Sequence, residues 1–205
     1  MLSVFQFRYV LILKLLLHGV KHQMIIGVTG KICSGKNCVA ELFVSKGFEV
    51  WDLDCEAEKV RKDFSEEIFK AFGTVNRKEL ASIVFSNPMK LKMLENIIYP
   101  HLKEKIENYK KNLVINGALL QRAGFDCLCS FVVFVKSSYG IRLKRALKYR
   151  KLTKNDFIAR NNAQKDVRPL KKLYTCPLFV IENNGQDIKK LKEDPDIIFS
   201  LLPKF

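Results

Sequence analysis

The feature that most constrains the fold of this chain is a glycine-bounded loop, Gly30–Lys36. Residues 24–29, before it, form an apolar run typical of a buried strand, and residues 37–44, after it, have the pattern of a helix. Gly30 and Gly35 allow backbone angles that a Cβ would forbid, so backbone N–H groups can point inward at a phosphate. The lysine supplies a mobile positive charge for the outer phosphates. This order of strand, loop and helix predicts a phosphate-binding loop.

One position departs from the usual form of such a loop. The residue after the lysine is normally Ser or Thr, whose hydroxyl binds Mg²⁺, and here it is Asn37. The amide oxygen of Asn37 can still bind this hard cation, whereas the thiol of Cys38 is a soft and poor ligand for it. The residues expected to hold the nucleotide are Gly30, Cys33, Ser34, Gly35, Lys36, Asn37 and Cys38.

Predicted strands and helices alternate along the rest of the chain, which indicates an α/β fold with a parallel sheet and helices on both faces. Five strands are expected, at residues 25–29, 48–52, 113–115, 131–135 and 178–181. A helical insertion is expected at residues 54–110 and a basic helical segment at 141–172. Capping patterns indicate three helix starts: Asn76 with Glu79, Asn87 with Pro88, and Thr153 with Asp156.

Composition narrows the class of partner. The 205 residues are 48% apolar, enough for one domain with a substantial core. The net charge of +15 attracts anions such as nucleotides, phosphorylated cofactors or nucleic acid, although a lysine-rich surface explains it as well and no RNA-binding signature is present. The six cysteines lack the C-x-x-C spacing of a zinc site, so we expect reduced thiols in a cytoplasmic protein.

Residues 1–23 stand apart from this pattern. Their apolar stretch, residues 9–17, looks like the core of a signal peptide, but Lys14 interrupts it and no small-residue cleavage site follows. The stretch is too short to span a bilayer. We expect a dispensable extension before a domain at residues 24–205, with a weak interfacial helix as the alternative.

Two carboxylates, Asp52 and Asp54, follow the second predicted strand. Because ligands of open α/β sheets bind at the carboxyl ends of the strands, these side chains can hold Mg²⁺ or accept a proton from a substrate hydroxyl. The alternative is that they cap the helix that follows. The basic segment offers arginines for a moving phosphate, although any single one can equally belong to a solvated helix face.

Seven ordered motifs resemble those of the dephospho-CoA kinase family. They are Gly30–Lys36; residues 50–54; residues 77–80 with 84–88; residues 97–100; residues 118–120 with 123–126; Arg145, Arg150 and Arg160 with Gln164; and residues 182–185. The similarity runs from about Ile25 to the C-terminal helix. It implies a five-stranded P-loop kinase fold of the nucleoside-kinase type, with a lid. The implied reaction moves the γ-phosphate of ATP to the ribose 3′-hydroxyl of dephospho-CoA, giving coenzyme A and ADP.

The resemblance also implies roles for individual residues. Asp54 would accept the hydroxyl proton, and Lys36 with the loop amides would hold the phosphates. Arg145 and Arg150 would steady the transferring charge. The implied cofactors are ATP and Mg²⁺, and the implied metal ligands are Asn37 and Asp52. Dephospho-CoA is the implied partner, and no nucleic acid or membrane is expected.

The chain departs from the family pattern at several positions around the predicted site. Lys31 and Cys33 replace residues that are usually glycine, Tyr99 replaces a histidine, Asn116 an aspartate and Arg122 a glutamate. Up to two negative groups are therefore missing near the substrate pocket, so binding can survive while the rate falls. Two other functions stay open: another small P-loop kinase acting on a nucleoside monophosphate, and a non-catalytic nucleotide or RNA binder descended from the kinase.

Overall fold

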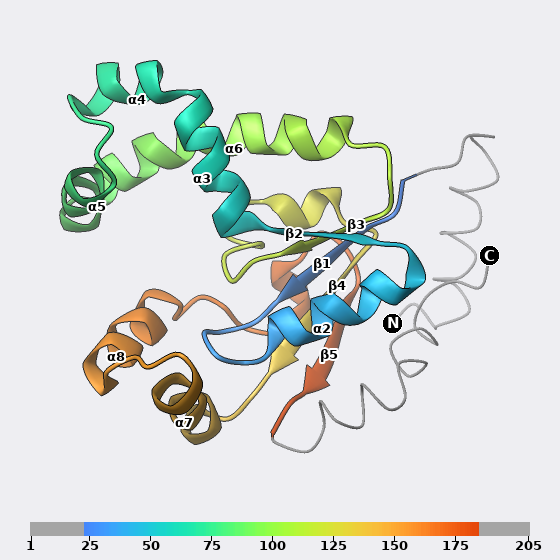
Figure 1. The fold of residues 1–205 in the computed structure, drawn as a ribbon. Coiled ribbons are helices and arrows are strands. Elements are labelled where there is room, and N and C mark those ends of the chain that lie inside the picture. The colour runs from blue at the N-terminus through green and yellow to red at the C-terminus, as the bar shows by residue number, and fades with distance from the viewer. Residues whose placement is uncertain (1–22, 185–205) are drawn as a thin grey trace.

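The computed structural model describes residues 23–184, which are built around one five-stranded parallel sheet (Figure 1). The strands are β1 (Ile25–Thr29), β2 (Glu49–Asp52), β3 (Leu113–Asn116), β4 (Phe131–Lys136) and β5 (Leu178–Glu182). They lie in the order β2-β3-β1-β4-β5, and all neighbouring pairs are parallel. The predicted strands and their parallel arrangement are confirmed.

The strand register brings the predicted site residues to one edge of the sheet. Val28 of β1 and Asp52 of β2 are both register partners of Asn116 in β3. The phosphate loop leaves β1 directly after Thr29. The loop, Asp52 and Asn116 therefore begin side by side at the carboxyl edge, where ligands of open α/β sheets bind.

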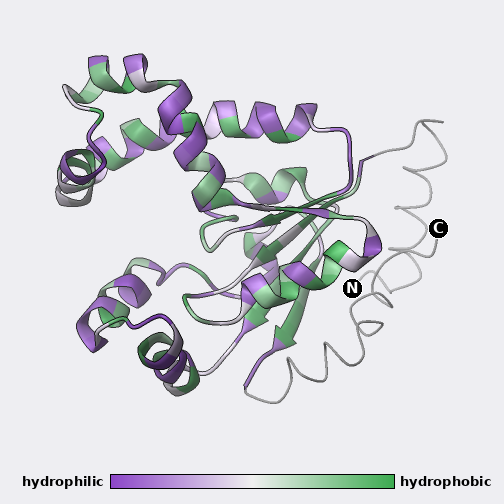
Figure 2. Ribbon diagram, viewed as in Figure 1, coloured by the Kyte–Doolittle hydropathy of each residue, from purple (hydrophilic) through white to green (hydrophobic). Residues whose placement is uncertain are grey.

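Helices cover both faces of the sheet, as predicted. On one face lie α2 (Lys36–Leu42) and the 3₁₀ turn η1 (Phe43–Lys46), which share a buried core with β1 and β4. On the other face lie α3 (Leu53–Asp63) and α6 (Pro88–Asn108), with a second core. Figure 2 shows the hydrophobic colour concentrated on the strands, and the helices alternate between polar and apolar positions.

The insertion between β2 and β3 is helical, as predicted, and adds α4 (Ser65–Phe72) and α5 (Arg77–Ser86) to α3 and α6. Asn87 caps α6 through two backbone N–H groups, which confirms the start predicted from the Asn-Pro pair. Asn76 caps α5 in the same way, but the reciprocal half of the predicted capping box is wrong. The N–H of Asn76 donates to the hydroxyl oxygen of Thr74, two residues before it, rather than to Glu79. The Thr74 hydroxyl in turn donates to the carboxylate of Glu79.

The basic segment after β4 forms α7 (Tyr139–Tyr149) and α8 (Lys154–Ala163), followed by the 3₁₀ turn η3 (Lys171–Leu173). The capping box predicted at the start of α8 is present in both directions. Figure 1 shows α7 and α8 on one side of the carboxyl edge and the helical insertion on the other, so the edge lies between two helical groups.

Within the described residues, no helix is long and apolar enough to cross a membrane. The predicted extension, residues 1–23, lies outside the described part of the chain except for Gln23. All six cysteines carry free thiols, as predicted.

Candidate active site

The phosphate loop has the backbone that its two glycines were predicted to permit. Gly30 has a φ of 152°, and a Cβ there would lie 2.4 Å from the carbonyl oxygen of Val135 and 2.6 Å from Ser34 Oγ. Gly35 has a φ of 97° and directly precedes α2. Lack of space excludes a side chain at Gly30, and the left-handed backbone disfavours one at Gly35. The sequence thus forces the turn that places Lys36 at the start of α2.

Cys33 is a strained residue within this loop. Its φ is 59°, in the left-handed region, where a non-glycine residue costs about 1–2 kcal/mol relative to the right-handed one. The family pattern has glycine at this position, for which the same backbone is free of that cost. The replacement therefore keeps the loop conformation but destabilises it.

Arg145 supports the loop from outside. Its Nη1 donates hydrogen bonds to the carbonyl oxygens of Cys33 at 3.4 Å and Ser34 at 3.2 Å. Its Nη2 donates to Oδ1 of Asn183 at 2.9 Å, and the amide of Asn183 donates to the same Ser34 carbonyl at 2.7 Å. Because the carbonyls are held outward, the loop N–H groups can face a phosphate.

The resemblance predicts that Arg145 contacts the transferred phosphate, whereas in the structure its guanidinium bonds to the loop and to Asn183. A direct contact with the phosphate stays a prediction. Asn183 was missed as a site residue, although it is fully buried and joins the end of β5 to the loop. Its place in the motif at residues 182–185 was the signal that could have identified it.

We call residues 139–164, which comprise α7, α8 and Gln164, the lid segment. The lid segment also contacts the loop directly. Gln164, just after α8, accepts a hydrogen bond at 2.7 Å from the N–H of Ile32. Arg142 of α7 donates to the carbonyl oxygen of Ile32 at 3.4 Å and to Oδ1 of Asn161 at 2.9 Å. Through these contacts the basic helices and the loop form one continuous hydrogen-bonded unit.

Asp52 and Asp54 have different positions, which the sequence did not separate. Asp52 is the N-cap of α3: its Oδ1 accepts from the N–H of Asp54 at 3.0 Å and of Cys55 at 3.2 Å. Asp54 lies in the first turn of that helix, and its side chain lines a cavity. Leu53, which lies between the two aspartates, packs closely against Gly117, where a Cβ would lie only 2.8 Å from Leu53 Cδ1. This packing holds the start of α3 against the loop that follows β3. The capping alternative therefore applies to Asp52.

Asp54 and Lys36 influence each other electrostatically. Burial raises the pKa of Asp54, the carboxylate of Asp52 raises it further, and Lys36 opposes both. Burial lowers the pKa of Lys36, and the two aspartates oppose that shift. Although Asp54 is exposed as a whole residue, its carboxylate lies at the wall of the cavity, which explains the effect of burial. A lysine and a carboxylate with opposed shifts thus share one site, as in many catalytic centres.

The cavity has a volume of about 790 Å³ and lies between the loop, the insertion and the lid. Its charged lining residues are Lys36, Arg122, Arg150, Arg160, Asp54 and Glu95. The α6 side contributes an apolar wall that includes Leu91, Leu94 and Ile98. Four cations against two carboxylates suit an anionic ligand, and the apolar wall suits a ligand with an uncharged arm.

Tyr99 and Arg122, which replace residues of the family pattern, both contact the carboxylate of Glu95. Glu95 was not among the residues predicted from the sequence. Tyr99 Oη donates to Oε1 of Glu95 at 3.3 Å, and Arg122 Nη2 donates to the same oxygen at 3.2 Å. Arg122 also lies 3.9 Å from Asp166, beyond α8. The charge reversal at position 122 is thus balanced by Glu95, whose spacing of four residues from Tyr99 on α6 was the available signal.

The oxygen ligands at the sheet edge suit a hard cation. Asn116 is only 3% exposed, and its Oδ1 has no hydrogen-bond partner among the described residues. Its register partner is Asp52, and Asn37 is the second residue of α2. Within residues 23–184, no group of three or more His, Cys, Asp or Glu side chains could hold a metal ion. Mg²⁺ usually takes one or two protein oxygens together with water and phosphate, so this donor set fits it.

Comparison with known proteins identifies the family. The family model described as dephospho-CoA kinase matches residues 24–188. A dephospho-CoA kinase of Thermus thermophilus is 33% identical over 179 residues, which cover 82% of this chain and 87% of the relative. The Fusobacterium nucleatum enzyme of the same name is 36% identical over 148 residues, covering 64% and 76%. A crystal structure from Thermus thermophilus has a TM-score of 0.73 at 31% identity, covering 89% of this chain and 99% of that one. With its phosphate loop, its sheet-edge carboxylates and its lid in the matched region, the chain belongs to the dephospho-CoA kinase family.

Proposed function

We propose that this chain phosphorylates dephospho-CoA with ATP, and that Asp54 and Lys36 act on the two reacting groups in one cavity. The observation that supports this most is that both side chains line the 790 Å³ cavity and oppose each other's pKa shifts. The ribose 3′-oxygen attacks the γ-phosphorus while Asp54 accepts its proton. The bond between the γ-phosphorus and the bridging oxygen breaks, and ADP leaves with the electron pair.

The cations divide between holding and stabilising the phosphates. Lys36 and the loop N–H groups bind the β- and γ-phosphates of ATP, as in other P-loop kinases. Arg150 and Arg160 also line the cavity, and their role in this proposal is to stabilise the charge of the transferring group. Arg145 acts through the loop, because its guanidinium fixes the Cys33 and Ser34 carbonyls.

Asn37 and Asp52 would hold Mg²⁺, with Asn116 offering a further oxygen at the same edge. When bound, Mg²⁺ neutralises charge on the β- and γ-phosphates. Asp52 can serve in this way while its Oδ1 continues to cap α3, because a carboxylate has several lone pairs.

The acceptor side of the cavity suits dephospho-CoA. This substrate carries a diphosphate and a long uncharged arm, which match the basic and apolar parts of the lining. Arg122 supplies a cation there, and Glu95 keeps it oriented through the 3.2 Å contact. A nucleoside monophosphate has no such arm to cover Leu91, Leu94 and Ile98. Six free thiols favour a reducing compartment, so we place the protein in the cytoplasm.

An acceptor panel tests this function. The purified full chain is incubated with ATP and Mg²⁺ and with dephospho-CoA, AMP or a short RNA, and products are separated by mass. We expect coenzyme A and ADP in equal amounts from the first acceptor, and kcat/KM for AMP at least about 100-fold lower, the scale of a site that loses several contacts. Comparable rates with AMP would favour the nucleoside monophosphate kinase, and nucleotide binding without any product would favour the non-catalytic binder.

A further inference from the structure

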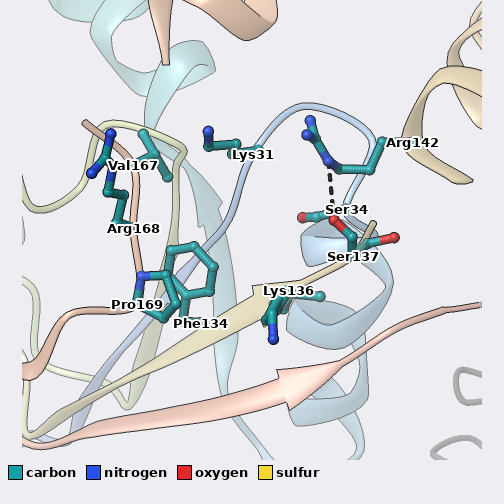
Figure 3. A pocket seen from close by; sticks show the side chains of 10 residues that line it. Lys31, Ser34, Phe134, Lys136, Ser137, Arg142, Val167, Arg168 and Pro169 are labelled. Atoms are coloured by element: carbon teal, nitrogen blue, oxygen red, sulfur yellow. Dashed lines mark hydrogen bonds between the residues drawn. The ribbon is translucent and has the colours of Figure 1, made fainter. Parts of the chain in front are cut away.

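A second, smaller hollow lies behind the phosphate loop, away from the cavity that contains Asp54. Its volume is about 240 Å³, the space of about eight water molecules at 30 Å³ each. It is too small for a drug-sized ligand but large enough for a small hydrated anion. Its principal lining residues are Lys31, Ser34, Phe134, Val167, Arg168 and Pro169. Figure 3 shows Phe134 and Pro169 together at one wall and Lys31 extending above them.

Two cations of this hollow have no carboxylate partner. Within the described residues, neither Lys31 nor Arg168 forms an ion pair, and Arg168 only donates to the backbone oxygen of Lys165. Burial, followed by the charges of Arg142 and Arg168, lowers the pKa of Lys31, and only Asp166 opposes this. Asp166 itself lies 3.9 Å from Arg122. Positive charge is therefore gathered here with only partial compensation from Asp166, which does not line the hollow.

The other two cations of the lining are already occupied. Lys136 pairs with Glu182 at 2.6 Å, and Arg142 donates to the carbonyl oxygens of Ser137 and Ile32. They contribute to the positive field, whereas Lys31 and Arg168 have donors to offer.

A buried hydroxyl adds an independent observation. Ser34 is only 1% exposed, and its Oγ has no hydrogen-bond partner among the described residues. Figure 3 shows this oxygen directed into the hollow, on the side of Phe134 and Pro169. An unpartnered buried hydroxyl costs about 1–3 kcal/mol unless something binds it.

We infer that this hollow binds a phosphate-type oxyanion, held by Lys31 and Arg168 with a hydrogen bond from Ser34. The site differs from the nucleotide site, because Lys31 and Arg168 are absent from the lining of the large cavity. Since Ser34 belongs to the phosphate loop, an anion here would fix the loop from behind. The inference stands independently of the proposed reaction.

The test measures anion binding while ADP saturates the nucleotide site. Inorganic pyrophosphate is titrated into the full chain with excess ADP and followed by calorimetry, for the wild type, Arg168→Gln and Lys165→Gln. Lys165 is exposed and does not line the hollow, so its variant is a control for lost charge. We expect one pyrophosphate per wild-type chain, about tenfold weaker binding in Arg168→Gln, as for one lost charge-assisted hydrogen bond, and less than a twofold change in Lys165→Gln.

Two sources of the phosphate group are distinguished by a second titration with ADP alone. Two ADP molecules per wild-type chain, falling to one in Arg168→Gln, would support the site with a nucleotide phosphate as its occupant. One ADP together with one pyrophosphate would support it with a free anion. One ADP per chain together with no pyrophosphate binding in the presence of ADP, or equal weakening in Arg168→Gln and Lys165→Gln, would overturn the inference.

Discussion

The replacement Asp54→Asn separates chemistry from structure at this site. Asp52, not Asp54, caps α3, and within residues 23–184 no hydrogen bond or ion pair to the Asp54 carboxylate is present. Because the folded state raises the pKa of Asp54, its ionised carboxylate is disfavoured there at neutral pH, and removing the charge should change stability by no more than about 1 kcal/mol, or a few degrees in Tm. Loss of a general base costs a factor of about 10²–10⁴ in rate, or about 2.7–5.4 kcal/mol of barrier. The catalytic effect should therefore exceed the structural one.

The assay follows coenzyme A formation at saturating substrates, together with ADP binding and thermal melting. We expect kcat to fall at least about 100-fold, while ADP affinity changes less than threefold and Tm by about 3 °C or less. Asp63→Asn is the matched control, because it removes the same charge from the exposed far end of α3. Near-native turnover in Asp54→Asn, or an equal loss in Asp63→Asn, would refute the assignment of Asp54 as the base.

The wild type should also show the raised pKa of Asp54 in its pH profile. Only the ionised carboxylate can accept a proton, so kcat/KM should fall as pH decreases through a value above the ordinary 3.8. In the folded state Asp54 keeps its proton to higher pH than in the unfolded state. Its contribution to stability is therefore present below the unfolded pKa and is lost as pH rises through the folded one. In Asp54→Asn the acidic limb of the rate profile should disappear from the residual activity.

Three further predictions concern the loop and the extension. Cys33→Gly should raise the free energy of unfolding by up to about 1 kcal/mol in chemical denaturation, because it removes the left-handed strain; a loss of stability would show that the Cys33 side chain packs favourably. Asn37→Thr should lower the Mg²⁺ concentration for half-maximal activity by restoring a hydroxyl ligand, and an unchanged or higher requirement would exclude Asn37 as a metal ligand. A form starting at Met24 should fold and turn over like the full chain, since β1 starts at Ile25; an unfolded product by circular dichroism would show that the extension packs into the domain.

The fold was predictable because its determinants are local. A continuous apolar run such as residues 131–135 is typical of a strand that is buried on both faces of a sheet. The two glycines of the phosphate loop permit the positive φ angles that its turn requires. Helix caps were predictable at Asn87 and Thr153, because their side-chain oxygens accept hydrogen bonds from N–H groups in the first turn of the helix that follows. The partner of Asn76 was misassigned because Thr74 competes for the same donor.

The site was less predictable, because its roles depend on contacts between distant segments. The sequence alone cannot show which of Asp52 and Asp54 caps the helix, because both lie where the helix begins and its first residue is uncertain. Nor can it show that Arg145 reaches the loop carbonyls rather than the cavity, a contact across more than a hundred residues. Glu95 escaped notice because its importance comes from Arg122, which is close to it only after folding.

The cavity shared by Lys36 and Asp54 should direct phosphate transfer to one hydroxyl of dephospho-CoA. The most direct test is phosphorus NMR of the product formed from ATP and dephospho-CoA by the wild type, with Lys36→Met as the inactive reference. We expect a single new phosphomonoester on the ribose 3′-oxygen, equimolar with ADP, and none from Lys36→Met. A phosphate at another position, ADP without coenzyme A, or equal product from Lys36→Met would contradict it.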